Sequence, residues 1–150
     1  MTDDPVRQRA VALYNQSWDL LEDPKRDVAG DRKLLVAACG SRACWEGIGD
    51  AENLSVGDWM VARVLAELGV GDLAVSFAQS ALDLAERNDM PIWMRASAME
   101  GLARAHAASG SADERDRCVA LAGDLVNQIP DAEDRDLIAS QLATVPEVAR

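Results

Sequence analysis

The chain has 150 residues, of which 49% are apolar and 27% are charged. This length and composition predict a single domain over residues 1–150, large enough to fold without a metal ion or a disulfide. The 26 acidic and 15 basic residues give a net charge of −11, which argues against nucleic-acid binding and against attachment to an anionic membrane. No membrane-spanning segment is expected either, because no apolar stretch is long enough to cross a bilayer.

The cysteines and the N-terminal segment point to the cytoplasm. Cys39, Cys44 and Cys118 are odd in number and have no CxxC spacing, as is typical of unpaired thiols in a reducing compartment. Residues 1–5 are acidic and lack the basic flank and apolar core of a signal peptide. We expect a cytoplasmic protein with no metal site and no cofactor, because no two potential ligands share metal-binding spacing on one element.

The first elements in chain order are two helices and a loop. Apolar residues recur at helical spacing along the whole chain, and no segment shows the alternation of a strand. A helix is predicted over about 4–22, with Asp4 as its N-cap and Pro5 at its first position. A second helix follows over about 30–45, and residues 47–53 are predicted to form a loop.

Five further helices are predicted between clear stop signals, over about 55–68, 72–87, 92–109, 112–129 and 131–145. Gly69 and Gly110 are typical C-terminal caps, Pro130 closes the sixth helix, and Asp131 with Asp134 resembles a capping pair that opens the last one. Together these signals predict an all-α domain of about seven helices. The short connections favour antiparallel neighbours.

An internal repeat accompanies the helical pattern. Shifting residues 62–86 forward by 41 onto 103–127 gives eight matches in 25 positions, where about two are expected by chance. The matches include the pairs Arg63/Arg104 and Gly69/Gly110. The sequence therefore predicts two copies of one helix-turn-helix unit, with the glycine supplying the left-handed turn between its helices.

The small and apolar positions of this unit resemble those of tetratricopeptide-like (TPR-like) helical repeats. The resemblance covers about 55–130, although the period of 41 differs from about 34 in that family. It implies antiparallel helical hairpins stacked as a short right-handed superhelix, with the first helix of each pair on the concave side. Residues 41–45, 57–59 and 99–106 also resemble a small uncharacterised bacterial family, which implies no chemistry. The positions that carry the TPR-like resemblance are Ala62, Leu65, Gly69, Ala74, Ala81, Leu82, Ala103, Gly110 and Ala122, with Pro130 beyond them.

The resemblance implies a binding groove made of Trp59, Arg63, Glu100 and Arg104, beside Ser97. Arg63 and Arg104 occupy equivalent repeat positions, so they would stand side by side as contacts for a carboxylate, a phosphate or an acidic peptide terminus. In the alternative interpretation, Glu100 pairs with both arginines in a structural network between helices.

A second candidate site uses the single histidine, His106, and the tryptophans. His106 would suit general acid or base chemistry if it faced a pocket, but a packed core histidine is the more common case. Core filling is likewise the more common role for the four tryptophans, with one or two exposed as interface anchors the alternative. No phosphate loop, nucleotide fingerprint or nucleophile elbow is present, so no catalytic residue is predicted.

These patterns favour a cytoplasmic interaction module that binds a protein or peptide partner in a concave groove. The alternative is a small-molecule binding protein or an unrecognised enzyme, with a pocket between the helix layers formed by Trp45, Trp59, Glu100 and His106. A third interpretation is a homodimer joined through an open end of the repeat stack, because short stacks without polar caps tend to associate.

Overall fold

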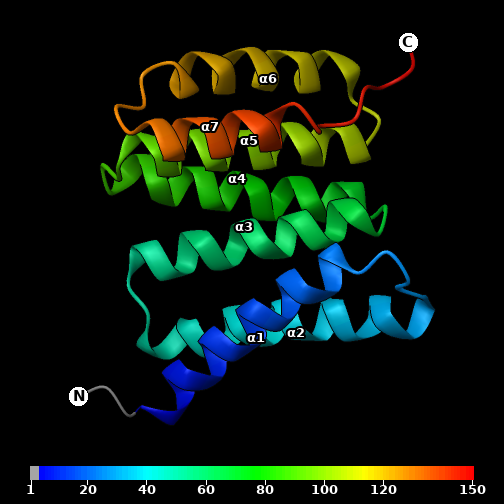
Figure 1. The fold of residues 1–150 in the computed structure, drawn as a ribbon, viewed down its shortest axis with the longest axis vertical. Coiled ribbons are helices and arrows are strands. Elements are labelled where there is room, and N and C mark those ends of the chain that lie inside the picture. Colours follow the sequence, from blue (N-terminus) through cyan, green and yellow to red (C-terminus); the bar gives the residue numbers. More distant parts are fainter. Residues whose placement is uncertain (1–3) are drawn as a thin grey trace.

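The computed structural model describes residues 4–150, which form seven α-helices and no strand (Figure 1). The all-α prediction is therefore confirmed. Across these residues, no helix has both the length and the apolar character that crossing a bilayer would need. In chain order the helices are α1 (Pro5–Glu22), α2 (Val28–Ile48), α3 (Ala51–Glu67), α4 (Gly71–Arg87), α5 (Ile92–Ala108), α6 (Ala112–Val126) and α7 (Ala132–Leu142).

The helix starts follow local capping chemistry. The side chain of Asp4 accepts a hydrogen bond from the amide of Val6, and Pro5 occupies the first helical position of α1. Asp131 accepts in the same way from the amide of Asp134 at the start of α7. Both caps match the sequence prediction, because an acidic side chain satisfies amides that have no partner within the helix.

The predicted loop over 47–53 was wrong, since only Gly49 and Asp50 separate α2 from α3. Asp50 and Asn53 form a capping box: the carboxylate of Asp50 accepts from the amide of Asn53 at 3.0 Å, and the Asn53 side chain accepts from the amide of Asp50 at 3.2 Å. The polar residues of this segment therefore start a helix instead of extending a loop.

The two repeat turns have the same backbone geometry. Gly69 and Gly110 have φ angles of 78° and 77°, in the left-handed region that glycine adopts without a Cβ penalty. The amide of Val70 donates to the carbonyl of Leu65 at 2.8 Å, and the amide of Ser111 donates to the carbonyl of His106 at 3.0 Å. The left-handed turns predicted from the repeat are thus confirmed, and each one closes a helix in a Schellman-type arrangement.

The helices stack as hairpins from α1/α2 at one end to α6/α7 at the other (Figure 1). Each helix packs against the next along the chain. In addition, α3 contacts α1 and α5, and α5 contacts α7, whereas α2, α4 and α6 do not contact one another. The odd-numbered helices therefore form a continuous layer, and the side chains on its outer face lie close to those of neighbouring odd-numbered helices.

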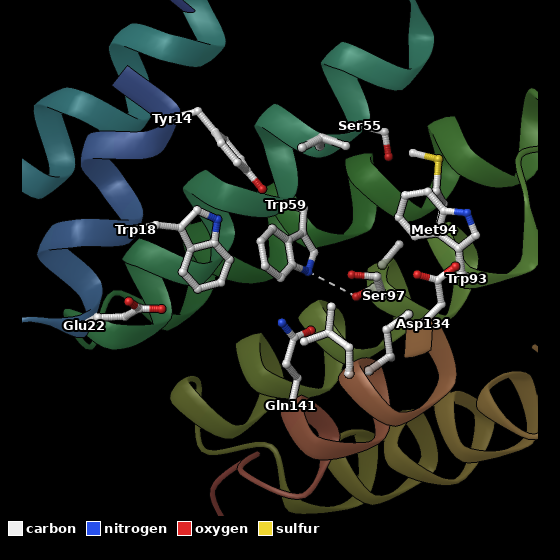
Figure 2. Close-up of a pocket in the computed structure, with 14 residues that line it drawn as sticks. Tyr14, Trp18, Glu22, Ser55, Trp59, Trp93, Met94, Ser97, Asp134 and Gln141 are labelled. Carbon is white, nitrogen blue, oxygen red and sulfur yellow. Dashed lines mark hydrogen bonds between the residues drawn. The ribbon is translucent and has the colours of Figure 1, made fainter. Parts of the chain in front are cut away.

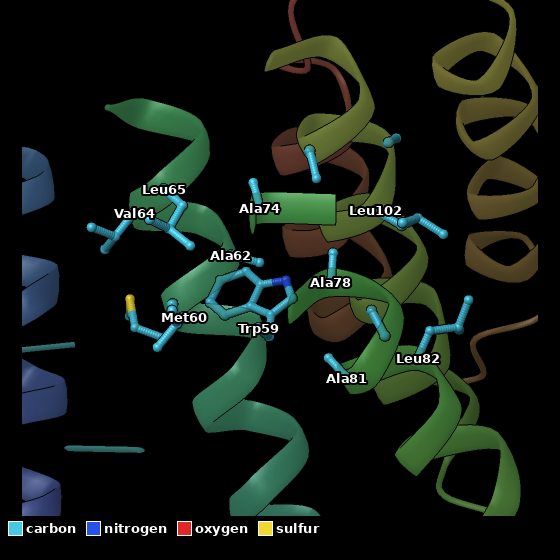
Figure 3. Packing of buried hydrophobic residues seen from close by; sticks show 14 of the residues in the cluster. Trp59, Met60, Ala62, Val64, Leu65, Ala74, Ala78, Ala81, Leu82 and Leu102 are labelled. Atoms are coloured by element: carbon cyan, nitrogen blue, oxygen red, sulfur yellow. The ribbon is translucent and has the colours of Figure 1, made fainter. Parts of the chain in front are cut away.

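Small side chains allow α3, α4 and α5 to pack closely (Figure 3). On α4, Ala74, Ala78 and Ala81 are completely buried, and on α5 Ala103 is as well. Larger side chains such as Leu102 fill the remaining space between these helices. This close approach brings the Trp59 region of α3 against α5.

Candidate functional site

A cavity of about 450 Å³ opens on the layer of odd-numbered helices (Figure 2). Its lining comes from α1, α3, α5 and α7, and from no other helix. Because α3 and α5 pack against each other, they form the floor, while α1 and α7 stand on opposite sides as walls. We refer to this cavity, lined by residues of these four helices, as the odd-helix pocket.

Four aromatic side chains line the pocket: Tyr14 and Trp18 from α1, Trp59 from α3 and Trp93 from α5. The rings of Trp18 and Trp59 have centroids 5.7 Å apart and are tilted by 41°, within the favourable range for aromatic pairs. Trp59 is buried, Trp18 is partly buried and Trp93 is 39% exposed. Part of the aromatic surface, from Trp18 and Trp93, is therefore open to a ligand at this place.

Trp59 is held in the floor by α5. Its indole Nε1 donates a hydrogen bond to the carbonyl of Ser97 at 3.1 Å (Figure 2). A Cβ added at Gly101 would lie 2.8 Å from Cδ1 of Trp59, so the absence of a side chain at Gly101 makes room for the indole. Of the predicted groove residues, only Trp59 lines the pocket, together with Ser97, which was expected beside the groove.

In the part of the chain that the structure describes, the only charged side chains that line the pocket are acidic. Glu22 is exposed on the α1 wall and Asp134 is partly buried on the α7 wall, on opposite sides of the cavity (Figure 2). Within residues 4–150, neither carboxylate takes part in a hydrogen bond or an ion pair. The remaining lining includes apolar side chains such as Leu137, which is 57% exposed.

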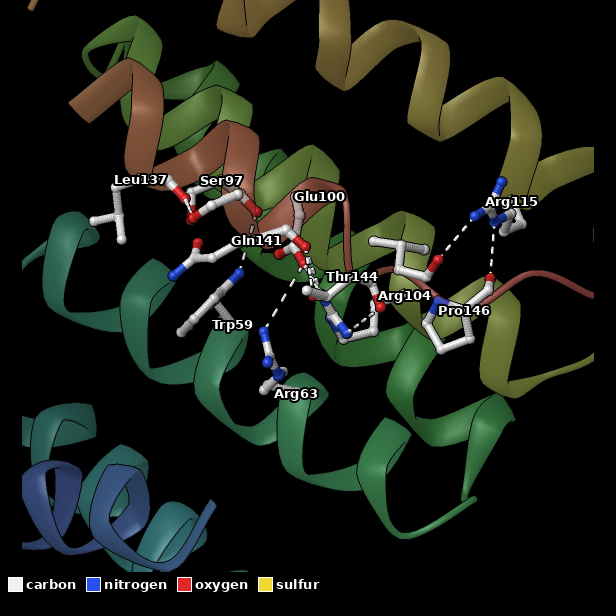
Figure 4. A network of polar contacts seen from close by, with 12 residues as sticks. Trp59, Arg63, Ser97, Glu100, Arg104, Arg115, Leu137, Gln141, Thr144 and Pro146 are labelled. Carbon is white, nitrogen blue, oxygen red and sulfur yellow. Dashed lines mark hydrogen bonds and ion pairs between the residues drawn. The ribbon is translucent and has the colours of Figure 1, made fainter. Parts of the chain in front are cut away.

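Glu100 lies at the centre of a polar network behind the pocket (Figure 4). Its side chain is fully buried, and Oε1 accepts from Nε and Nη2 of Arg104 at 2.9 and 2.6 Å. Arg104 also donates to the carbonyl of Gln141 at 2.9 Å and to Oγ1 of Thr144 at 2.8 Å. This guanidinium therefore joins α5 to the C-terminal end of α7.

Arg63 is the third member of this network. Its Nη1 lies 3.9 Å from Oε1 of Glu100, and its guanidinium lies over the Trp18 ring, 5.9 Å from the ring centroid. Nε and Nη1 of Arg63 and Oε2 of Glu100 are buried without hydrogen-bond partners among the described residues. Burial, and then the nearby charge of Arg104, lower the pKa of Arg63.

Arg63, Glu100 and Arg104 thus form the interhelical network that the sequence offered as the alternative to an anion site. Both arginines reach the same carboxylate of Glu100, and none of the three side chains lines the odd-helix pocket. A role for Arg63 and Arg104 as anion contacts stays a prediction.

The structure does not bring Trp45 and His106 into one pocket with Trp59. Trp45 is buried on α2, where the guanidinium of Arg7 lies 5.0 Å from its ring centroid. His106 borders a separate hollow on the side of the even-numbered helices. The second pocket inferred from the sequence is therefore corrected, because α2 lies outside the odd-numbered layer and His106 points away from that layer.

His106 is partly buried in this second hollow, near Glu114 and Arg117 of α6. Burial lowers the pKa of its imidazole, and the two neighbouring charges act in opposite directions. Its Nδ1 is buried and has no hydrogen-bond partner within the described residues.

Sequence reasoning missed the contribution of α1 and α7 to the site. The signal was present in the helical spacing: Tyr14, Trp18 and Glu22 follow each other at intervals of four residues along α1, which places them on one face. On α7, Asp134, Leu137, Ile138 and Gln141 follow the same three-four rhythm. Each pattern resembles the buried face of an ordinary core helix. Only the positions of the neighbouring helices in the folded protein show that this face lines a pocket.

A buried acid on α3 was also missed. Asp58 is 3% exposed, and its two oxygens accept from Nε of Arg42 at 2.6 Å and from Oγ of Ser80 at 2.7 Å. This side chain joins α2, α3 and α4 away from the odd-helix pocket. It therefore has a structural role in the hairpin stack.

Comparisons with protein-family models, with curated proteins and with solved structures found no match to this chain. The TPR-like resemblance accordingly rests on the internal repeat. Over residues 4–150, no group of three or more His, Cys, Asp and Glu side chains gathers in a way that could hold a metal ion.

Proposed function

We propose that this chain is a short TPR-like interaction module of the cytoplasm that binds a peptide or protein segment in the odd-helix pocket. The observation that carries the proposal is the convergence of four helices from separate parts of the chain on one hollow. Pockets between helices with mainly apolar walls and a few polar groups are typical binding sites. The three unpaired cysteines are consistent with the cytoplasm.

Exposed apolar side chains at the rim support binding of a macromolecular segment. Trp93 is 39% exposed and Leu137 is 57% exposed, and both line the pocket from different helices. Tryptophan is among the residues that contribute most to binding energy at interfaces. A bound segment would remove this surface from water, which supplies a driving force in proportion to the apolar area covered.

A small molecule is the second candidate, and the size of the cavity is the observation in its favour. The volume of about 450 Å³ lies within the range of about 300–1,000 Å³ that is typical of small-molecule sites. Native mass spectrometry of the protein purified from its own cells tests this candidate. A retained mass that Trp93→Ala/Leu137→Ala removes would favour it over a peptide ligand.

The proposed function is tested by selecting a random dodecapeptide phage library on the immobilised protein. Individual peptides from enriched clones are then titrated in solution, with tryptophan fluorescence as the readout. The pocket variant is Trp93→Ala/Leu137→Ala, which shortens two exposed side chains and should leave folding intact. The matched control is Leu73→Ala/Leu121→Ala, two exposed leucine positions on α4 and α6 that do not line the pocket.

The expected result is a set of peptides that bind the wild type and the control variant equally and bind the pocket variant at least tenfold more weakly. Losing an interface anchor costs more than 1 kcal/mol, and a tenfold change corresponds to about 1.4 kcal/mol. Circular dichroism checks that all three proteins are equally folded. Enrichment of no clone, or equal binding to the pocket variant, would overturn the proposed function.

A further inference from the structure

We infer that the segment bound in the odd-helix pocket presents one or two basic side chains, arginine in preference to lysine, to the aromatic rings and to the carboxylates of Glu22 and Asp134. This inference rests on the proposed function and specifies the chemistry of its partner. It differs from the sequence-based expectation of an acidic partner held by Arg63 and Arg104. It is carried by the charge of the pocket lining, by the position of Arg63 and by the aromatic rings.

The charged side chains of the pocket lining favour a cation. Among the described residues, 4–150, Glu22 and Asp134 are the only charged ones that line the pocket, and none that lines it is basic. Within residues 4–150 no hydrogen bond or ion pair engages either carboxylate. An apolar or acidic occupant would displace water from these carboxylates without supplying a hydrogen-bond donor or an opposite charge, which is unfavourable. A cation would pair with them, so charge complementarity selects a basic occupant.

Arg63 does not line the pocket and forms no ion pair with either of these carboxylates. Arg63 lies beside the pocket, but its guanidinium is directed to Trp18 and Glu100, at 5.9 Å from the ring centroid and 3.9 Å from Oε1. Its charge is opposed only in part by the carboxylate of Glu100, which also pairs with Arg104. At longer range, the net charge of −11 attracts a basic partner and repels an acidic one.

The aromatic rings add a second reason for a cation. Along α1, Tyr14 and Trp18 precede Glu22 on the same face, and across the pocket Trp93 and Asp134 come from neighbouring helices (Figure 2). Tryptophan and tyrosine faces attract cations, and arginine is found over them more often than lysine. Arginine also has a planar fork that stacks on rings and binds carboxylates through two hydrogen bonds.

The size of the pocket agrees with a side chain as the occupant. A cavity of about 450 Å³ accommodates one or two long side chains of a peptide whose backbone crosses the rim. The aliphatic stem of arginine or lysine can lie along apolar walls such as Leu137, while the charged end reaches a carboxylate. A basic residue with an apolar neighbour is therefore the expected core of the bound sequence.

The test uses the peptides selected on the wild-type protein. The first readout is their composition relative to the unselected library. The second is the affinity of three proteins for these peptides: the wild type, Glu22→Gln/Asp134→Asn, and the matched control Asp19→Asn/Glu133→Gln. The control neutralises one exposed carboxylate on α1 and one on α7 that do not line the pocket, so it removes the same net charge.

A third readout tests whether a basic residue of the peptide pairs directly with the carboxylates of the pocket. Each basic residue of a selected peptide is replaced in turn, arginine by citrulline and lysine by glutamine. The loss of affinity is measured on the wild type and on Glu22→Gln/Asp134→Asn. If a peptide cation pairs with the pocket carboxylates, its replacement weakens binding to the wild type and has little effect on the variant.

We expect enrichment of arginine and lysine in the selected peptides. We also expect about fivefold weaker binding by Glu22→Gln/Asp134→Asn, as two partly exposed ion pairs would give, and less than twofold change in the control. Peptides that need Trp93 and Leu137 but contain no enriched basic residue, or that bind Glu22→Gln/Asp134→Asn normally, would overturn this inference and leave the proposed function standing. Failure to obtain any peptide that depends on the pocket would overturn both.

Discussion

Nη2 of Arg104 lies 2.6 Å from Oε1 of Glu100, four residues earlier on the same helix, and this pair is buried behind the odd-helix pocket. The same guanidinium holds the carbonyl of Gln141 and the hydroxyl of Thr144 at the end of α7. Since α7 forms one wall of the pocket, the pair positions that wall from behind. The network and the pocket are therefore parts of one arrangement.

Replacing Glu100 by glutamine should strongly destabilise the protein. The substitution leaves Arg104 and Arg63 close together without a compensating charge, and breaking a buried pair in this way costs about 3–5 kcal/mol. Urea unfolding followed by circular dichroism measures the change in free energy. Glu114→Gln, which breaks the exposed pair with Arg117, is the control and should leave the unfolding midpoint unchanged. Equal stability of Glu100→Gln and wild type would contradict the structural role of the network.

Gly101→Ala and Gly123→Ala should act in opposite directions although both glycines lie within helices. A Cβ at position 101 would lie 2.8 Å from Cδ1 of Trp59, whereas a Cβ at position 123 would meet nothing within 4 Å. We expect Gly101→Ala to destabilise by about 1–3 kcal/mol through overpacking. Gly123→Ala should stabilise by up to about 1 kcal/mol through helix propensity.

Thermal unfolding compares the two glycine variants, and near-ultraviolet circular dichroism reports on the packing of the Trp59 indole. A changed tryptophan signal in Gly101→Ala, with none in Gly123→Ala, is expected. A Gly101→Ala variant more stable than the wild type would contradict the close packing of α3 against α5 at Trp59.

The left-handed turn positions predict another pair of opposite effects. Gly69 and Gly110 have φ angles of 78° and 77°, and Asp89, in the connection after α4, has a φ of 48°. Gly69→Ala or Gly110→Ala should each destabilise by about 1 kcal/mol, because a side chain in this conformation is strained. Asp89→Gly should stabilise by a few tenths of a kcal/mol up to about 1 kcal/mol. Differential scanning calorimetry measures these changes, and a destabilised Asp89→Gly would show that its side chain makes a compensating contact.

His106 predicts a loss of stability in mild acid. Burial lowers the pKa of its imidazole below the ordinary value of 6.5, so the folded protein binds this proton less readily than the unfolded chain does. The contribution of the neutral form is present above pH 6.5 and is lost as the pH falls through the unfolded and then the folded pKa. His106→Gln should therefore lose less stability than the wild type between pH 7.5 and pH 5.

The measurement is the urea midpoint of wild type and His106→Gln at several pH values in this window. The difference between the two proteins should change in favour of the variant as the pH falls. Parallel curves for the two proteins would mean that the imidazole is not sheltered in the folded state.

Local chemistry accounts for how much of the fold could be predicted. The caps at Asp4 and Asp131 and the turns at Gly69 and Gly110 depend on a few neighbouring residues, so the sequence was sufficient to predict them. The segment over 47–53 was ambiguous because aspartate and asparagine favour both loops and helix starts. In the structure, the reciprocal hydrogen bonds between Asp50 and Asn53 make this segment the start of a helix.

The candidate site was less accessible to prediction. The shift of 41 residues placed Arg63 and Arg104 at equivalent positions, and both do reach Glu100 in the structure. Helical periodicity specifies which face of a helix a residue occupies, but it does not specify what covers that face. The end of α7 covers Arg104, and no pattern within α5 contains that information.

By itself, the sequence determined an all-α chain of about seven helices, the caps at Asp4 and Asp131 and the repeated left-handed turns, because these depend on interactions between residues close in the chain. Only the tertiary structure decided that Glu100 is buried between two arginines. It also decided that Tyr14, Trp18, Trp59, Trp93 and two carboxylates surround one cavity. Such a site depends on how distant helices pack, and packing is set by the shapes of many side chains at once.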